Sequence, residues 1–253
     1  MQDPFVKTSQ QDGIGTVNFF HPQSNSLPSS QLQAIAEAIT QLSLNSELRV
    51  IVIQSHGENT FCAGASFDEL AAIGNAEEGD RFFSGFANVI NAMRLAPQLI
   101  IARIQGKAVG GGVGIACAAD YTLARTTASV KLSELAVGIG PFVVGPAVER
   151  KIGLAAFSQL AIHASEWQSA EWALQKGMYQ GVFPTVSELD QAVTSLAKNL
   201  AQSHPEAMKA LKSVFWEGTE HWNELLLKRA KISGHLVTSS FTRNAIQKFK
   251  SKR

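Results

Sequence analysis

The stretch Leu99-Ile-Ile-Ala-Arg-Ile-Gln-Gly-Lys-Ala-Val-Gly-Gly-Gly112 joins an apolar run directly to a cluster of glycines. Residues 99–104 are almost wholly apolar, which is the pattern of a strand buried on both faces of a sheet. We expect a helix to begin within the glycines and to continue to about Ala119. A buried strand that passes through a glycine turn into a helix is typical of α/β proteins with crossover connections.

An earlier stretch shows the same pattern of a buried strand followed by small residues. Arg49-Val-Ile-Val-Ile-Gln54 predicts a second buried strand, and the small residues of Phe61-Cys-Ala-Gly-Ala-Ser66 follow it after a polar turn. Ser29 and Ser30 are the predicted N-caps of an amphipathic helix over 31–44. Further strands are predicted at 15–20, 121–124 and 128–132, and a further helix at 79–95.

The pattern changes near Pro141. Beyond it, helical periodicity predominates, without a Gly/Ser linker or an internal repeat. We therefore divide the chain into an α/β core over residues 1–195 and a helical C-terminal region over residues 196–253. The predicted helices cover 141–152, 155–163, 169–176, 186–201, 205–216 and a long stretch from 220 onward.

Composition argues against several classes of protein. The chain of 253 residues carries 22 Lys and Arg against 21 Asp and Glu, and this net charge of +1 disfavours a nucleic-acid-binding surface. Its longest apolar stretch, 108–119, is shorter than the ~20 residues that span a bilayer. The N-terminus shows no secretory h-region. We expect a cytoplasmic protein that binds neither nucleic acid nor membrane, and the charged fraction of only 17% favours an oligomer.

Motifs for several other chemistries are missing. No register of the glycines fits G-x-G-x-x-G, and neither a P-loop, a G-x-S-x-G elbow nor H-E-x-x-H occurs. Cys62 and Cys117 lie far apart in apolar settings, so we expect two reduced core thiols rather than a disulfide. Scattered histidines and cysteines without metal-ligand spacing predict no metal site.

Three features can carry chemistry: the loop Cys62-Ala-Gly-Ala65, the loop Gly110-Gly-Gly112, and Glu134. Small residues let a backbone approach a ligand closely, and two unpaired amides that converge form an oxyanion hole. Glu134 lies in an apolar segment, where desolvation raises the pKa of a carboxyl group and strengthens it as a base. Each feature alone has a plainer interpretation, which is tight strand-to-helix packing for the glycines and an exposed or ion-paired glutamate.

With these three features together, the sequence resembles the crotonase superfamily, which is the enoyl-CoA hydratase/isomerase family. The resemblance covers nearly the whole chain, including the helical C-terminus. It is carried by the segments 49–53, 60–66, 104–112, 119–124, 132–153 and 167–177.

The resemblance implies both a fold and a chemistry. Residues 1–195 are expected to form a spiral of ββα units that binds acyl-CoA, and residues 196–253 a helical trimerisation region. Trimers of this family often pair into hexamers. The expected substrate is an acyl-CoA thioester, with no separate cofactor, since coenzyme A is part of the substrate. By position in the motifs, the amides of Ala65 and Gly111 hold the thioester oxygen and Glu134 is the catalytic base.

One departure from the family pattern narrows the choice of reaction. Family hydratases carry two glutamates, and the place of the first, three residues beyond Gly111, is taken by Gly114. A single glutamate at the Glu134 position suits an isomerase that moves a double bond from the 3- to the 2-position of an enoyl-CoA. Two alternatives stay open: a hydratase with non-standard water activation, and an acyl-CoA-binding protein without catalysis.

The resemblance also implies a set of substrate contacts. Phe142 stands where dienoyl-CoA isomerases carry an aspartate, which argues against that branch and suggests an apolar wall or core packing. Lys248 and Lys250 are candidates to meet a phosphate of CoA, although charged ends are usually only solvated. The predicted substrate-binding residues are Gln23, Ser24, Ala63, Ser66, Phe67, Asp68, Gly110, Gly114 and Phe142.

Overall fold

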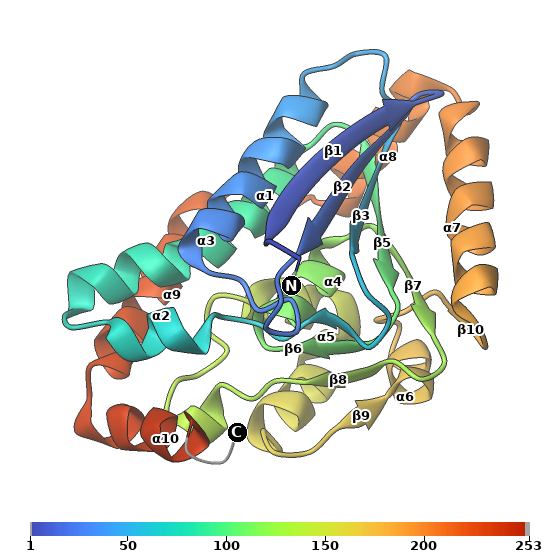
Figure 1. Ribbon diagram of the computed structural model, residues 1–253. Coiled ribbons are helices and arrows are strands. Elements are labelled where there is room, and N and C mark those ends of the chain that lie inside the picture. Colours follow the sequence, from blue (N-terminus) through green and yellow to red (C-terminus); the bar gives the residue numbers. More distant parts are fainter. Residues whose placement is uncertain (1, 251–253) are drawn as a thin grey trace.

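A six-stranded sheet is the frame of the computed structural model, which describes residues 2–250 (Figure 1). Its strand order is β1-β2-β3-β5-β7-β10, and every neighbouring pair is parallel except the hairpin of β1 with β2. The two apolar runs predicted as buried strands, β3 and β5, lie at its centre. The strands are β1 (Phe5–Gln11), β2 (Ile14–Phe20), β3 (Val50–Ser55), β5 (Leu99–Ile104), β7 (Tyr121–Arg125) and β10 (Gly181–Phe183).

A smaller four-stranded sheet carries the glycine loops. Its order is β4-β6-β8-β9, with β4, β6 and β8 parallel and β9 antiparallel to β8. The chain passes from β3 to β4 and from β5 to β6, so both glycine loops leave the same edge of this sheet side by side. The strands are β4 (Thr60–Cys62), β6 (Lys107–Val109), β8 (Ser129–Lys131) and β9 (Gln168–Ser169).

Helices cover both faces of the large sheet (Figure 1). Helices α1 (Ser29–Ser43) and α3 (Ala76–Leu95) lie on the face that holds the main apolar core, and α7 (Val186–Ala201) covers the other. Alternate residues of β3 therefore enter different cores, with Ile53 on the α1 side and Val52 on the α7 side. This two-sided burial explains why the strand is apolar without interruption.

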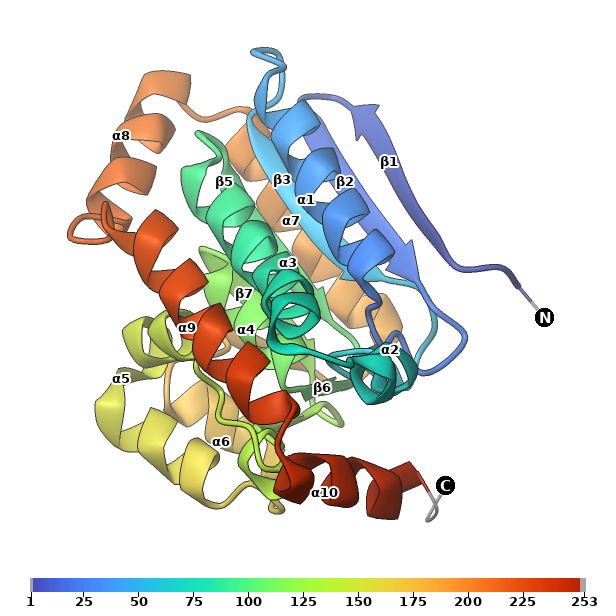
Figure 2. The same ribbon diagram turned by 90° about the vertical axis from the view of Figure 1, so that its left-hand side faces the viewer.

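Three helices end the described chain: α8 lies near β5, α9 runs alongside α3, and α10 follows α9 at the lower end of the molecule (Figure 2). Helix α9 runs very close to α3, because a Cβ on Gly79 would lie only 2.7 Å from the Cα of Gly234. Glycine at both positions lets the two backbones touch. The helices are α8 (Pro205–Phe215), α9 (Trp222–Val237) and α10 (Ser240–Lys250).

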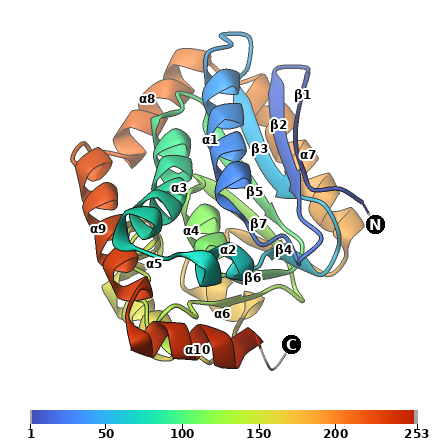
Figure 3. The ribbon, with the colours of Figure 1, turned by 60° about the vertical axis from the view of Figure 1, so that its left-hand side comes forward.

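Helix α10 lies beneath α2 (Phe67–Ala72) at the lower edge of the molecule (Figure 3). Arg243 Nη2 donates to the carbonyl of Gly74, just beyond α2, at 3.1 Å. Thr242 Oγ1 donates to the carbonyl of Gly138 at 3.0 Å. Two polar contacts therefore tie the C-terminal helix to segments that come from the α/β core.

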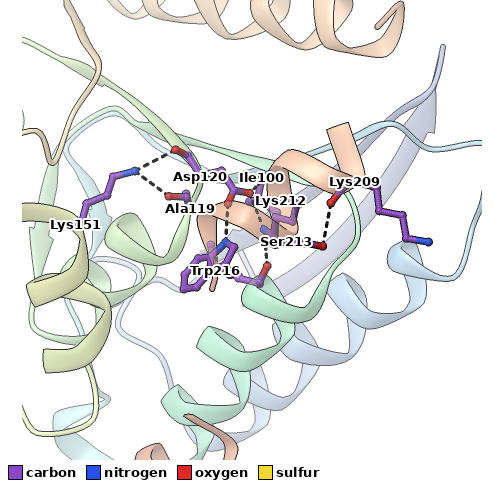
Figure 4. Close-up of polar contacts among 9 residues, drawn as sticks. Ile100, Ala119, Asp120, Lys151, Lys209, Lys212, Ser213 and Trp216 are labelled. Carbon is purple, nitrogen blue, oxygen red and sulfur yellow. Dashed lines mark hydrogen bonds and ion pairs between the residues drawn. The ribbon is translucent and has the colours of Figure 1, made fainter. Parts of the chain in front are cut away.

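A buried carboxylate connects α8 to the large sheet (Figure 4). Asp120 Oδ2 accepts hydrogen bonds from the backbone N–H of Ile100 at 2.7 Å and from Lys212 Nζ at 2.6 Å. Its Oδ1 accepts from Trp216 Nε1 at 2.8 Å. Lys151 Nζ donates to the carbonyl of Asp120 at 3.1 Å. These contacts fix α8 against the N-terminal end of β5.

The part of the chain beyond Pro141 contains more than the helices that were predicted there almost exclusively. Strands β9 and β10 lie within it, and β10 completes the large sheet. The break predicted between helices 141–152 and 155–163 is confirmed, because Gly153 has non-helical backbone angles within α5 (Gly145–Ile162), although the first helix begins at Gly145 rather than at residue 141. Its φ of +76° and ψ of +160° lie outside the helical region, so the chain kinks there between two helical segments.

The predicted N-caps of α1 are also wrong. The N-cap position is Pro28, which has no side-chain oxygen to accept from a helix amide. Instead, Glu69 accepts from the backbone N–H of Ser29 at 2.7 Å and from its hydroxyl group. A carboxylate from α2 therefore replaces the local cap. The remaining elements are α4 (Gly111–Ala118), the 3-10 turn η1 (Leu135–Val137) and α6 (Ala170–Gln175).

The overall prediction of an α/β fold with C-terminal helices is confirmed. The division at residue 195 stays a prediction, and that position falls inside α7. Among residues 2–250, none of the helices combines the length and the apolar character needed to cross a bilayer.

Candidate active site

The two glycine loops, the segment around Glu134 and the aromatic side of α3 enclose a cavity of about 60 Å³. Its walls are almost entirely apolar, and Glu134 is its one titratable side chain among the described residues. The lining residues are Ala63, Gly64, Ala65, Phe67, Leu70, Phe83, Phe86, Val109, Gly110, Gly111, Ser133, Glu134, Val137, Ile139, Gly140, Pro141, Phe142, Val143, Val144 and Ser233.

The loop after β4 places Ala65 at this cavity. Gly64 has a φ of +85°, and a Cβ there would lie 2.9 Å from the carbonyl oxygen of Val109. Leu27 N donates to Gly64 O at 2.8 Å and Ser66 N donates to Leu27 O at 3.1 Å, so the loop is held on both sides of Ala65. The amide of Ala65 itself has no hydrogen-bond partner in the described part of the chain.

The loop after β6 places a second uncommitted amide beside the first. Gly110 has a φ of +53°, and a Cβ there would lie 3.0 Å from Glu134 Oε1. Gly111 begins α4, so its amide has no partner within the helix, and none occurs elsewhere in residues 2–250. Phe86 packs on Gly111 so closely that no side chain fits there. The loops touch, since a Cβ on Gly64 would lie 3.5 Å from Gly111 N.

Glu134 lies directly before η1, with its carboxyl group beside Gly110. Its carbonyl accepts from Ile139 N at 2.9 Å, which fixes the turn that carries it. Although the residue keeps some exposure, its Oε2 atom is buried and has no hydrogen-bond partner in the described residues. Desolvation raises the pKa of Glu134 to about 7, against a smaller lowering by its own backbone N–H. The predicted rise in pKa is thus found.

Chemically, the arrangement can stabilise an enolate. The two loops touch, and each has a free amide that can donate a hydrogen bond to an oxygen that gains negative charge. A carboxyl group with a pKa near 7 can both take and return a proton at neutral pH. The surrounding apolar walls exclude water and strengthen both interactions.

Gly114 does not reach the cavity. It lies on the buried side of α4, and a Cβ there would come within 2.4 Å of Val144 Cγ1 and 2.7 Å of Val144 Cβ. Val144 therefore fills the space that a longer side chain at position 114 would need, and Val144 itself lines the cavity. The apolar wall expected near Phe142 is present, because Phe142, Val143 and Val144 all line the cavity.

Most of the predicted site residues line the cavity, and some lie outside it. Gln23 Nε2 donates to Asp68 Oδ2 at 2.8 Å, and Ser24, with a φ of +56°, accepts from Ala63 N at 3.2 Å. Ser66 caps α2 and accepts from Glu69 N. The cavity includes Ala63, Ala65, Phe67, Gly110, Gly111, Glu134 and Phe142, and it excludes Gln23, Ser24, Ser66, Asp68 and Gly114.

The two lysines considered as phosphate contacts lie on α10, apart from the cavity. The side chain of Lys250 lies outside the part of the chain that is described. A role for either lysine stays a prediction.

Several lining residues could not be recognised from the sequence. Ser233 comes from α9 and is 1% exposed, and it reaches the cavity because Gly234 brings α9 against α3. Phe83 and Phe86 come from the inner face of α3, where spacing indicates only core packing. A Gly79–Gly234 contact between distant helices is not visible in a linear pattern.

The cysteines lie apart from this chemistry. Cys62 and Cys117 are free and buried, and burial raises the pKa of each thiol to about 12. Thiols with such pKa values stay protonated and unreactive at neutral pH. Within residues 2–250, His, Cys, Asp and Glu form no group of three suited to a metal ion.

Two uncommitted amides beside one desolvated carboxyl group suit a reaction that forms an enolate, and comparison with known proteins gives the family of the chain. Residues 9–253 match the model of the family described as enoyl-CoA hydratase/isomerase. A carnitinyl-CoA dehydratase from Salmonella heidelberg (strain SL476) is 33% identical over 194 residues, which are 77% of this chain and 73% of the relative. The chain therefore belongs to the enoyl-CoA hydratase/isomerase family of the crotonase superfamily.

Solved structures agree with this fold. The enoyl-CoA hydratase from Bacillus halodurans superposes with a TM-score of 0.87 at 20% identity, covering 96% of this chain and 99% of that chain. An enoyl-CoA hydratase from Mycobacterium avium subsp. paratuberculosis K-10 gives 0.86 at 24% identity, covering 98% and 96%. At these identities the likeness concerns the fold, and it confirms the crotonase-like architecture expected from the sequence.

Proposed function

We propose that the protein isomerises 3-enoyl-CoA to 2-enoyl-CoA thioesters, with Glu134 as the single base. The observation that carries this proposal is the composition of the cavity wall, in which Glu134 is the one titratable group among the described residues. Val144 occupies the space beside Gly114, where family hydratases have a second carboxylate. Isomerisation needs one group that moves a proton, whereas hydration needs water to be activated as well.

The proton transfers balance without any further reactant. The Glu134 carboxylate removes a proton from C2 of the 3-enoyl thioester, and the electron pair moves onto the thioester oxygen as a dienolate. The amides of Ala65 and Gly111 donate hydrogen bonds to that oxygen. The neutral Glu134 carboxyl group then returns the proton to C4, which leaves the 2-enoyl isomer. No separate cofactor enters the reaction.

The two amides supply the stabilisation of charge. Loss of one oxyanion donor typically raises a barrier by ~2.7–4 kcal/mol, so a pair of backbone donors is a large contribution. Their position is rigid, because Leu27 brackets Ala65 and Phe86 packs on Gly111. Rigid donors need no reorganisation as charge develops.

Two other functions have specific support. The relative named carnitinyl-CoA dehydratase points to hydration or dehydration, in which Glu134 alone would handle both the C2 proton and water. The absent second glutamate, with Gly114 in its place, is what an acyl-CoA-binding protein without catalysis would show. A desolvated carboxyl group is of no use to a mere binder, which favours catalysis.

A direct assay separates the three functions. Purified protein is incubated with 3-enoyl-CoA and, separately, with 2-enoyl-CoA in water, and products are followed by chromatography and mass. We expect conversion of the 3-enoyl to the 2-enoyl ester, lost in Glu134→Gln and kept in the exposed control Glu206→Gln. Efficient hydration of 2-enoyl-CoA would overturn the preference for isomerisation. Binding without turnover of any acyl-CoA would identify a binder.

The nucleotide end of the substrate is also part of the proposal. Gln23 and Asp68 are joined by a hydrogen bond, and Ser24 and Ser66 flank the loop that carries Ala65. We propose that these residues border the adenine of CoA, outside the cavity for the acyl group.

A further inference from the structure

A second, polar cavity of about 380 Å³ lies at the carboxyl ends of β2, β3 and β5, on the face that α7 covers. It shares none of its lining residues with the candidate active site. The carboxyl ends of parallel strands are where open α/β sheets most often bind ligands. The cavity is lined by Asn18, Gln54, Ser55, His56, Gly57, Arg103, Asp190, Val193 and Thr194.

A row of polar side chains crosses the sheet at this point. Asn18 pairs with Gln54, and Gln54 pairs with Arg103, so the three lie side by side on one face. Two residues earlier on the same face, Val52 and Ile101 belong to the apolar cluster beneath α7. The α7 face therefore changes from apolar to polar at its carboxyl edge.

Much of the hydrogen-bonding capacity of this row is unused. Arg103 is 9% exposed, and its Nε donates to Asp190 Oδ1 at 2.6 Å, but neither terminal nitrogen has a partner in the described residues. Asn18 Oδ1 is buried without a partner, and the Gln54 side chain makes no hydrogen bond within residues 2–250. Among these atoms Asn18 Oδ1 is the buried one, and a buried polar atom left unpaired is destabilising, so it needs an explanation.

The plainer interpretation is that Arg103 only docks α7 through Asp190. That ion pair accounts for one of the five N–H donors of the guanidinium group and for neither amide. The attraction within the pair is weakened by water, because the Asp190 side chain is 50% exposed, whereas the Arg103 side chain is 10% exposed. Asp190 is the one carboxylate among the described residues that line the cavity.

We propose that this cavity binds a small oxyanion, namely the carboxylate or phosphate group of a small molecule. The terminal nitrogens of Arg103 are the main donors, since a planar guanidinium group pairs with oxyanions in two-pronged geometry. The amides of Asn18 and Gln54 orient the ligand, and rotation of either amide by 180° presents its NH2 group. A volume of about 380 Å³ leaves room for a body attached to the anion.

The test is a binding titration of the full-length protein with inorganic phosphate and, separately, acetate, followed by isothermal calorimetry. The decisive variant is Gln54→Met, which keeps length and the Arg103–Asp190 ion pair but removes the amide. Gln191→Met is the matched control, because Gln191 is exposed on α7 and does not line the cavity. We expect wild type and Gln191→Met to bind alike, and Gln54→Met to bind at least tenfold more weakly.

Two further variants test the roles of Asp190 and Arg103 in anion binding. Asp190→Asn removes the competing carboxylate, so we expect anion binding to tighten severalfold. Arg103→Met is expected to abolish binding while thermal unfolding remains cooperative; if that variant does not fold, the Gln54→Met comparison decides. Phosphate binding without acetate binding identifies a phosphate group as the ligand, and the reverse identifies a carboxylate.

Other results would overturn the proposal. Absence of heat with both anions in the wild type would show that water alone fills the cavity. Equal affinity of wild type and Gln54→Met would place the anion elsewhere, including the active site. Weaker binding after Asp190→Asn would contradict the role given to Arg103.

Discussion

Glu134 is desolvated in the resting protein and yet must lose a proton to act as a base. Burial raises the pKa of its carboxyl group to about 7, so about half of the molecules carry the carboxylate at neutral pH. We predict that kcat/KM for isomerisation rises with pH through this value and then levels, as measured between pH 5.5 and 8.5. A rate that is flat across pH 6–8 would show that another group limits proton removal.

The same pKa predicts an effect on stability. The folded-state pKa of about 7 exceeds the ordinary 4.5, so folding favours the neutral form. Stability contributed by this group is complete below pH 4.5 and is lost as pH rises toward 7. We expect Glu134→Gln to be more stable than the wild type at pH 8 by up to ~3 kcal/mol, and equal to it near pH 4. Urea unfolding at both values measures this.

The control for that experiment is Glu206→Gln, which changes an exposed carboxyl group on α8. It is expected to follow the wild type at both pH values. If Glu134→Gln were less stable than the wild type at pH 8, the carboxylate would have to be stabilised in the fold, and the site would need a different description.

Gly114 and Val144 form a steric pair that can be tested by a double-mutant cycle. Gly114→Ala puts a Cβ within 2.4 Å of Val144 Cγ1, so overpacking is expected to destabilise by ~1–3 kcal/mol. Val144→Ala leaves a small cavity, and the double variant should lose at least ~0.5 kcal/mol less than the sum of the single losses. Thermal and urea unfolding provide the four values. Strict additivity would mean that Val144 does not fill the space beside Gly114.

At the scale of single residues, the sequence predicted those lining residues that lie within the recognised motifs. Ala65, Gly111 and Glu134 follow short strands at fixed spacing, and all three line the cavity. Ser233 could not be predicted, because it reaches the cavity only through the packing of α9 on α3, whereas Val144 belongs to the apolar wall expected near Phe142. Such contacts join residues far apart along the chain.

At the scale of elements, Asp120 and Lys212 hold α8 to the large sheet. Their side chains are 5% and 4% exposed, and Asp120 also accepts from Ile100 N and Trp216 Nε1. We predict that Lys212→Ala destabilises by ~3–5 kcal/mol, because it leaves a buried carboxylate without its cation. Lys209→Ala, on the exposed side of the same helix, should change stability by less than ~0.5 kcal/mol. Urea unfolding compares them.

One outcome would contradict the prediction for Lys212→Ala. If Lys212→Ala and Lys209→Ala unfolded at the same urea concentration, water would be reaching Asp120 in the variant. The element would then be held by apolar contacts alone, among them the edge-to-face pair of Trp216 and Trp222 at 5.7 Å.

Elements were predicted best where periodicity and burial agree. The limits of β5 and α7 match the prediction, since β5 is buried throughout and α7 is strongly amphipathic. Strand β1 was missed because most of its residues are exposed, so no apolar alternation marks it. Strand β10 has three residues and depends on pairing with β7. The kink of α5 follows from Gly153, which the sequence suggested as a break.

For the whole molecule, the change of sheet between β3 and β4, and again between β5 and β6, is what creates the site. Parallel pairing of β4 with β6 aligns the two glycine loops at one edge, and β8 then delivers Glu134 to the same place. Each feature alone has a plain structural meaning, whereas the topology gives the three a common cavity. This is why the family resemblance, rather than any single motif, predicted the site.

The outer surface of α5 and α8 predicts that copies of the protein associate. Large apolar side chains remain exposed there, including Leu154 at 64% on α5, Val214 at 57% and Phe215 at 43% on α8. Arg150 of α5 lies 4.5 Å from the ring centre of Trp216, which directly follows α8, so α5 and the end of α8 meet at this point. Exposed apolar patches of this kind mark protein–protein contacts.

We predict that the protein sediments as a trimer or hexamer, and that Leu154→Asp combined with Phe215→Asp shifts it to monomers, because a buried unpaired charge opposes association. Leu44→Asp is the control, since Leu44 is 75% exposed at the C-terminal end of α1, a helix that carries none of these side chains. It should leave the assembly unchanged. A wild type that sediments as a monomer at micromolar concentration would contradict the prediction, and dissociation by Leu44→Asp alone would place the interface on α1 instead.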